Sequence, residues 1–360
     1  MNLSTKTRKI LKGESPIPLY FFALMPFSLV YSLAVRIRAA LYRIGVFNAR
    51  ALPCKVISVG NLTAGGTGKT PMVIYLARLL ASKGMKLAVL TRGYGGSREG
   101  RTEVVSDGKN VILSPAEAGD EAILLARSLP GVPVVMGGKR YEAGILAVER
   151  FNPEAVILDD AYQHLSLKRD INILLLDAVH PFGNGFTLPM GYLREPVCAA
   201  GRADIAVLTR TEIKAGTGSI SKAAPLLPVI KAAHRASSLR GLWGGEDIGL
   251  GSLAGARVLQ VSGLADPASF SLILQKFSAK ITKSLEYPDH HAYSQDDLAE
   301  IQAATSETGA EMVVTTEKDA VKLSTLKPVG VKVAVLGIEM EISEGADALD
   351  GLLFRHLGKN

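Results

Sequence analysis

One stretch of the sequence restricts the fold more than any other: the segment Val59–Thr70, which reads VGNLTAGGTGKT. It follows a short apolar run, Val56–Gly60, that is typical of a buried strand, and it precedes a helical pattern at Thr70–Ser82. A glycine-rich loop in this position directs successive backbone N–H groups and the positive end of the helix dipole at phosphate. The segment therefore predicts a P-loop and, with it, a nucleotide-binding α/β fold.

The end of this loop supplies the side chains that nucleotide chemistry needs. Lys69 is predicted to reach the β- and γ-phosphates, and the hydroxyl of Thr70 is predicted to bind Mg²⁺. The strict pattern has glycine where this chain has Thr63, so the match rests on GGTGKT and its strand–loop–helix context. A glycine-rich turn with no ligand is the alternative. The residues expected to contact the nucleotide are Thr63, Ala64, Gly65, Gly66, Thr67, Gly68, Lys69 and Thr70.

The body of the chain alternates short apolar runs with helical patterns. The runs are Lys86–Thr91, Val132–Met136, Ala155–Asp159, Ile171–Asp177 and Ala203–Thr209, and helical patterns include Ala118–Ser128 and Lys139–Phe151. Runs that are apolar on both faces are typical of parallel strands covered by helices on each side. The alternation predicts a P-loop NTPase-like, doubly wound parallel α/β sheet.

A glycine-rich stretch, Gly241–Gly255, interrupts this alternation and marks a predicted domain boundary. The alternation resumes with strand patterns at 258–262, 281–286, 311–316 and 331–337 and helical patterns near 269–277 and 295–306. We expect an N-terminal segment at residues 1–50, a P-loop domain at 51–240 and a smaller α/β domain at 241–360. The alternative is that the last part extends the first sheet.

The metal of a P-loop site needs an acidic partner at the end of a neighbouring strand. Asp159 and Asp160 end one predicted strand and run into Gln163 and His164, whereas Asp177 ends another. The second acid beside Asp159 favours that position, and Asp177 is the alternative, more typical of a cap or loop acid.

The charge of the chain is concentrated at its N-terminus. The formal net charge is +7, and the first fifty residues hold eight basic side chains and one acid, so the remainder is neutral. A neutral body offers no basic stripe for nucleic acid. The 19 residues from Ile17 to Val35 carry no charge and are rich in aromatics, which points to a membrane surface. The two cysteines, far apart, indicate neither a disulfide framework nor a metal cluster.

Three interpretations of this segment are open. A cleaved signal peptide requires small residues after the apolar run, but Val35 is followed by Arg36. A buried core helix would be kinked by Pro18 and Pro26. A membrane anchor needs about 20 apolar residues to span, which this run approaches. We favour an anchor, with an amphipathic continuation lying on the cytosolic face of the inner membrane, and leave a single N-terminal span as the alternative.

Two further loops carry candidate acid–base groups. Gly119-Asp120-Glu121 precedes a helical pattern, and Pro288-Asp289-His290-His291 follows a predicted strand. Taken alone, Asp120 is typical of a helix cap, and a pair of histidines is more often structural than catalytic.

Taken together, the motifs and their order resemble the tetraacyldisaccharide 4′-kinase (lipid A 4′-kinase) family over nearly the whole chain. In addition to the basic, apolar N-terminus and the P-loop, they are Arg92–Gly96, Gly119–Glu121, Asp159-Asp160 with Gln163-His164, Phe182–Gly185, Leu193–Pro196, Pro288–His291 and Thr316–Asp319. The family pattern usually has glycine where this chain has Ala161 and proline where it has Ala122. Both departures concern loop geometry and remove no proposed catalytic group.

The resemblance implies a reaction: ATP, with Mg²⁺, phosphorylates the 4′-hydroxyl of a membrane-held tetraacyldisaccharide 1-phosphate. It implies that Asp120 is the base, that His290 is its partner, and that Asp160 belongs to the catalytic set. The implied metal site consists of Thr70, Asp159, Asp160 and Glu195, with Arg92 and Arg194 as phosphate contacts. The expected partners are the lipid substrate and the membrane surface, with no nucleic acid and no protein partner.

Two other functions are compatible with a P-loop. A membrane-associated ATPase switch would act on a protein partner, but such proteins often carry lysine where this chain has Ala64. A soluble small-molecule kinase would use the N-terminal helix as part of its core. The neutral body of the chain makes a nucleic-acid role the weakest option.

Overall fold

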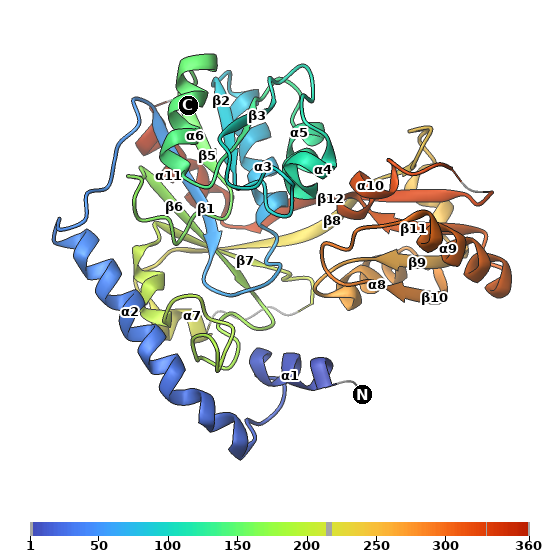
Figure 1. Cartoon of the computed structure of the whole chain (residues 1–360), viewed down its shortest axis with the longest axis horizontal. Coiled ribbons are helices and arrows are strands. Elements are labelled where there is room, and N and C mark those ends of the chain that lie inside the picture. Colours follow the sequence, from blue (N-terminus) through green and yellow to red (C-terminus); the bar gives the residue numbers. More distant parts are fainter. Residues whose placement is uncertain (1–2, 214–217, 329, 359–360) are drawn as a thin grey trace.

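The computed structural model describes residues 3–213, 218–328 and 330–358, and its described strands form one sheet of 12 strands (Figure 1). The strands are β1 (Lys55–Asn61), β2 (Leu87–Thr91), β3 (Glu103–Ser106), β4 (Val134–Met136), β5 (Ala155–Leu158), β6 (Ile171–Asp177), β7 (Ile205–Thr209), β8 (Val229–Gly241), β9 (Arg257–Ser262), β10 (Lys280–Glu286), β11 (Met312–Thr316) and β12 (Val333–Glu344). Their order is β10-β9-β11-β12-β8-β7-β6-β1-β5-β2-β4-β3. β1 therefore lies in the interior of the sheet, between β5 and β6.

Helices cover both faces of this sheet. They are α1 (Leu3–Lys12), α2 (Met25–Arg43), α3 (Lys69–Ser82), α4 (Pro115–Ala118), α5 (Asp120–Ser128), α6 (Arg140–Phe151), α7 (Gly218–Ala223), α8 (Pro267–Lys276), α9 (Gln295–Thr308), α10 (Glu317–Leu323) and α11 (Ala346–Leu357), with short 3-10 turns at Leu19–Leu24, Val197–Arg202 and Leu250–Leu253. Neighbouring residues of β1 show the two faces. Ile57 packs in a cluster with α3 and α5, whereas Val56 packs in another with α6.

The pairing confirms the predicted doubly wound α/β sheet and adds antiparallel strands to it. β8 was not among the predicted runs, and β12 continues beyond the predicted end at Gly337 to Glu344. These two long strands pair antiparallel, as do β3 and β4, whereas the other pairs are parallel. β8 was missed because its residues alternate between buried and half-buried or exposed positions, so it lacks a continuous apolar run.

The predicted boundary at residue 240/241 coincides with the end of β8. The strands that follow extend the same sheet, because β12 pairs with β8 and β11 with β12. β9, β11, α8 and α9 pack in clusters apart from the P-loop side, whereas α10, α11 and part of β12 pack in the same cluster as β1 and α3. The division into separate domains stays a prediction.

The N-terminal segment forms α1, a 3-10 turn and α2, and Figure 1 shows α2 standing at the margin of the molecule. Both prolines begin helices, Pro18 as the cap before the 3-10 turn and Pro26 in the first turn of α2, where a missing N–H is tolerated. The helix Leu19–Arg43 is long and apolar enough to cross a membrane, and only 11% of its most apolar window is buried. Such exposure excludes a core helix.

Candidate functional site

The P-loop connects β1 to α3 and takes a conformation that glycine makes possible. Gly68 has φ of +78°, and a Cβ atom placed there would lie 2.8 Å from Nε2 of His234. A neighbouring strand also fixes the loop: the hydroxyl of Thr209, at the end of β7, donates a hydrogen bond to the carbonyl of Thr67 at 3.0 Å. Lys69 and Thr70 follow in the first turn of α3, where unpaired N–H groups face the loop. The strand–loop–helix geometry predicted for this segment is present.

Asp160 lies beside the P-loop at the end of β5, which pairs with β1. Its backbone has φ of +48°, in the left-handed region that few residues other than glycine adopt. Nη1 of Arg194 donates to both carboxylate oxygens, at 3.0 and 2.9 Å, and Nζ of Lys69 lies 3.7 Å from Oδ1. The structure thus brings together three residues that were predicted separately.

Asp159 is buried in the same turn, with 3% of its surface exposed. Burial, followed by the charges of Glu121 and Asp160, raises the pKa of Asp159 to about 7. Its Oδ1 atom is buried and has no hydrogen-bond partner among the described residues. A buried acceptor with no partner beside a P-loop suits a hard cation such as Mg²⁺.

The rest of the acidic set is arranged differently. Glu195 is buried and lies 2.6 Å from Nη1 of Arg202, and neither of its carboxylate oxygens has a hydrogen-bond partner among the described residues. Its predicted metal role stays a prediction. Asp177 pairs with Arg210 at 2.8 Å and accepts the N–H of Val179, which is the arrangement of a loop acid. In the described part of the chain, no three histidine, cysteine or acidic side chains converge as a metal site. Mg²⁺ in kinases is held by one or two carboxylates and by substrate phosphates, so such a cluster is not required.

Arg140 supports this turn and was missed from the sequence. It is one of the largest fully buried side chains, and its Nη2 donates to the carbonyl of Asp159 at 3.2 Å. Its guanidinium also binds the carbonyl of Gly137. Burial lowers the pKa of Arg140 to about 10, which leaves it charged near neutral pH. An arginine at the start of a predicted amphipathic helix gave no signal that it would point inward.

The two candidate acid–base groups, 170 positions apart, meet at a second place on this edge of the sheet. Nδ1 of His290 lies 3.1 Å from Oδ2 of Asp120 and 3.2 Å from Oδ1. Asp120 is the first residue of α5, and His290 lies in the loop after β10 with φ of +61°. Tyr94 packs edge-on against the imidazole, with ring centroids 5.1 Å apart.

Charged neighbours set the ionisation of this pair. Burial alone would raise the pKa of Asp120, but the hydrogen bond with His290 and the charges of Lys318 and Lys322 outweigh it. The pKa of Asp120 is therefore held well below its usual range. The hydrogen bond with Asp120 raises the pKa of His290, and burial and Lys318 oppose that shift. The two lysines were not predicted as site residues, although Lys318 belongs to the motif Thr316–Asp319.

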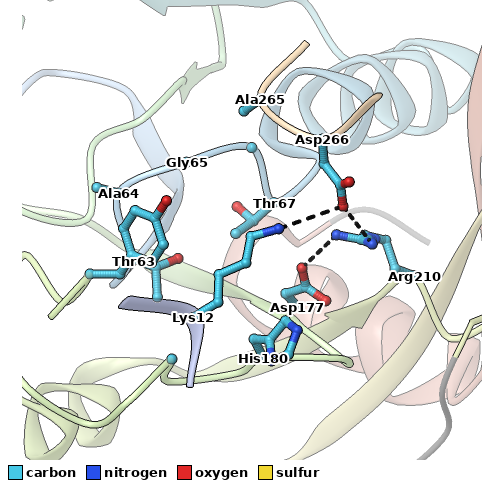
Figure 2. Close-up of a pocket in the computed structure, with 13 residues that line it drawn as sticks. Lys12, Thr63, Ala64, Gly65, Thr67, Asp177, His180, Arg210, Ala265 and Asp266 are labelled. Carbon is cyan, nitrogen blue, oxygen red and sulfur yellow. Dashed lines mark hydrogen bonds and ion pairs between the residues drawn. The ribbon is translucent and has the colours of Figure 1, made fainter. Parts of the chain in front are cut away.

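A cavity of about 240 Å³ borders the P-loop (Figure 2). Its walls include P-loop residues 63–67, together with Lys12 of α1, Arg210 after β7 and Asp266 before α8. Arg210 lies 2.8 Å from both Asp177 and Asp266, and Nζ of Lys12 lies 4.0 Å from Asp266. Through Asp266, these ion pairs connect α1 to Arg210 along the wall of the cavity.

α2 is attached to the site loops by its polar side chains. The hydroxyl of Tyr31 donates to the carbonyl of Arg194 at 2.9 Å, and Arg38 donates to the carbonyl of Gln163 at 3.2 Å. Ser28 and Thr187 bind each other at 2.9 Å. The opposite face is apolar and exposed, and it includes Phe27, Leu29, Val30, Leu33 and Ile37. We call these five residues the α2 apolar face.

Comparison with known proteins gives one consistent result. A model of the tetraacyldisaccharide-1-P 4′-kinase family matches residues 20–357. The chain is 46% identical over 351 residues to the tetraacyldisaccharide 4′-kinase of Pelobacter propionicus, covering 97% of this chain and 95% of that protein. It is 47% identical over 296 residues to the enzyme of that name from Geobacter sulfurreducens, with 82% of each chain covered.

A solved structure agrees with these relatives. The crystal structure of LpxK from Aquifex aeolicus, in complex with ATP, superposes with a TM-score of 0.78 at 35% sequence identity. The match covers 94% of this chain and 100% of that one.

Proposed function

Because the chain belongs to the tetraacyldisaccharide 4′-kinase family, we propose that it phosphorylates the 4′-hydroxyl of tetraacyldisaccharide 1-phosphate at the edge of the sheet between the P-loop and Asp120. It is an ATP-dependent kinase of lipid A biosynthesis, and it uses ATP with Mg²⁺. The observation that carries the residue assignment is the contact between Asp120 and His290. It supplies an acceptor for the hydroxyl proton, which a P-loop alone does not.

The nucleotide side of the site is assigned to the P-loop. Residues 63–70 would bind the phosphates through backbone N–H groups, and Lys69 would neutralise the transferred phosphoryl group. Arg194 is positioned to add a second positive charge, since it already binds Asp160 beside Lys69. Arg92 forms an ion pair with Glu99 at 3.0 Å. We also propose that Arg92 contacts phosphate.

The metal assignment rests on the donors in this turn. Asp159 offers a buried oxygen with no partner in the described chain, and Thr70 offers a hydroxyl at the start of α3. We assign Asp159, Asp160 and Thr70 to Mg²⁺, with Glu195, which is paired with Arg202, as a further candidate. When bound, Mg²⁺ would neutralise charge on the phosphates during the transfer.

The acceptor side performs the proton transfer. The 4′-oxygen forms a bond to the γ-phosphorus as the bond from that phosphorus to the β-bridging oxygen breaks, and ADP leaves. The hydroxyl proton passes to Asp120, whose orientation is fixed by His290. Because the transition state of phosphoryl transfer is loose, positioning of the hydroxyl contributes more than basicity does.

We further propose that the α2 apolar face rests on the cytosolic surface of the inner membrane. The substrate is a lipid, and a face exposing Leu29 by 62% and Leu33 by 58% has no partner in the described chain. The basic residues of this segment would add about 1 kcal/mol each near anionic lipid. The active-site loops bound to α2 would then lie close to the lipid headgroups.

An assay with radiolabelled ATP tests the reaction. In detergent micelles, we expect transfer of label only when the tetraacyl disaccharide is present, and a fall of about 100-fold or more in kcat for Asp120→Ala. ATP binding, measured by calorimetry, should be retained in that variant. Near-normal turnover by Asp120→Ala would remove Asp120 as the base.

Vesicle sedimentation tests the membrane proposal. Replacing Leu29 and Leu33 together by glutamate should lower binding to anionic vesicles about tenfold or more, since each buried leucine contributes about 2 kcal/mol. Leu272→Glu, at an exposed leucine of α8, is the matched control and should bind as the wild type does. Equal binding by all three proteins would contradict the assignment of this face.

The ATPase-switch alternative is not favoured, because the relatives and the family match are kinases. It would be supported by ATP hydrolysis that needs a protein partner and ignores the lipid.

A further inference from the structure

Two lysines of the short helix α10 point at the proposed base and its histidine. We propose that Lys318 and Lys322 are positioning residues for Asp120 and His290: Lys322 holds the carboxylate, and Lys318 holds the imidazole by a hydrogen bond to its far nitrogen. This inference rests on the proposed function of Asp120. It gives a function to helix α10, whose sequence motif Thr316–Asp319 did not indicate one.

The lysines reach the base because of helical spacing. Lys318 and Lys322 are four positions apart on α10, so they lie on the same face of the helix. α10 packs against α5, which begins with Asp120 and Glu121. Residues of the C-terminal part of the chain thus surround a carboxylate of the P-loop part.

Lys322 fixes the direction of the carboxylate. Its Nζ lies 2.9 Å from Oδ2 of Asp120, which is only 2% exposed. The other oxygen, Oδ1, accepts the backbone N–H of Glu121 at 2.9 Å. With one strong donor on each oxygen and His290 between them, the plane of the carboxylate is set. A charge-assisted hydrogen bond at such a buried site is among the stronger ones in proteins.

Lys318 contacts the nitrogen of His290 that faces away from Asp120, and this contact supports the tautomer that the acceptor-only carboxylate requires. Its Nζ lies 3.3 Å from Nε2 of His290. A lysine ammonium can only donate, so Nε2 is the acceptor in this contact. The neutral imidazole must then hold its proton on Nδ1, which is the nitrogen 3.1 Å from Asp120. The contact with Lys318 therefore leaves His290 a donor to the carboxylate.

The charges around Lys318 keep it protonated. Nζ of Lys318 lies 2.8 Å from Asp289 and 3.6 Å from Glu121, and these acids with Asp120 raise its pKa against the effect of burial. Lys318 faces four titratable groups on the elements packed against it. They are Asp120 and Glu121 of α5 and Asp289 and His290 of the loop after β10. Lys318 carries its charge throughout the neutral pH range.

The first test uses kinetics. Lys322→Met should lower kcat about 10- to 100-fold, the equivalent of one lost charge-assisted hydrogen bond, and leave the KM for ATP unchanged. The acid limb of the kcat–pH profile should move to higher pH, because the carboxylate loses a group that favours its ionised form. Lys322→Arg should restore much of the rate, and Lys276→Met, at an exposed lysine of α8, should match the wild type. An unchanged kcat and pH profile in Lys322→Met would overturn the role of Lys322.

The second test reads the tautomer directly and needs no activity. Nitrogen-15 NMR of the histidine rings in the wild-type chain, with His290→Gln to identify the signal, should show a proton on Nδ1 and a bare Nε2. In Lys318→Met, the Nε2 signal should shift because that nitrogen loses its hydrogen-bond donor. An unchanged Nε2 signal in Lys318→Met would overturn the role of Lys318, and a bare Nδ1 in the wild type would overturn the hydrogen bond from His290 to Asp120.

The proposed base and the proposed positioning lysines can be contradicted independently of each other. If Asp120→Asn keeps its kcat, the proposed base is wrong although the tautomer result can still hold. If Asp120→Asn is inactive while Lys322→Met is normal, the base stands and the role of Lys322 is overturned.

Discussion

The P-loop and the pair formed by Asp120 and His290 are built in opposite ways. The P-loop is a single turn between one strand and one helix, and the phosphate ligands proposed for it are mainly backbone N–H groups. The pair joins side chains 170 positions apart, and its neighbours Lys318 and Lys322 come from a third element. The difference indicates that the proposed phosphate site is built mostly from one local segment, whereas the proposed acceptor site depends on side chains from three separate elements.

Replacing the base should separate the two regions most clearly. We expect Asp120→Asn to lower kcat by about 10²- to 10⁴-fold, the usual contribution of a general base, because asparagine cannot accept the proton. The affinity for ATP should not change, since the P-loop is complete without Asp120. Single-turnover kinetics and calorimetry measure the two quantities. A joint loss of both would show that the regions are not independent.

The reciprocal change lies in the P-loop. Lys69→Met should lower kcat/KM for ATP about 10- to 100-fold, because one charged hydrogen-bond donor to phosphate is lost. The contact between His290 and Asp120 should persist, and the NMR signal of His290 reports it. Arg78→Met, which removes an exposed cation of α3 outside the loop, is the control. A shifted His290 signal in Lys69→Met would argue for coupling between the two regions.

A backbone change sharpens the same comparison. Gly68→Ala places a Cβ atom in the left-handed region and 2.8 Å from the His234 imidazole, so it should lower the free energy of unfolding by about 1–2 kcal/mol and weaken ATP binding. Gly66→Ala is the matched control, because a Cβ atom there meets nothing within 4 Å. Equal thermal stability of the two variants would contradict the strain assigned to Gly68.

Acid pH should lower the free energy of unfolding through the protonation of Asp120. Its pKa is lower in the folded chain than in the unfolded one, so it contributes stability above its ordinary pKa, and that contribution is lost as the pH falls through the folded value. Each unit of depression corresponds to about 1.4 kcal/mol. Between pH 5 and pH 3, the free energy of unfolding should therefore fall more steeply in the wild type than in Asp120→Asn. Parallel curves would mean that Asp120 is not held ionised.

Much of the P-loop side could be predicted because its signals are local. The strand Ile171–Asp177 has the predicted bounds, and the loop ends where Lys69 begins α3. Asp120 and His290 were paired only through family resemblance, since neither residue carries a signal of the other. β8 was not predicted because polar residues interrupt its sequence, so it contains no continuous apolar run. Burial of Arg140 depends on the packing of three elements, which no local pattern encodes.

The hydrogen bond from Tyr31 to the carbonyl of Arg194 has a consequence for how the enzyme meets its substrate. Arg194 binds Asp160, so a helix on the surface of the molecule and the acidic turn beside the P-loop share one rigid linkage. If α2 rests on the bilayer as proposed, this linkage fixes the height of the catalytic turn above the lipid. The sugar could then be phosphorylated while its acyl chains stay among their neighbours, and the search for substrate becomes one of lateral diffusion in two dimensions.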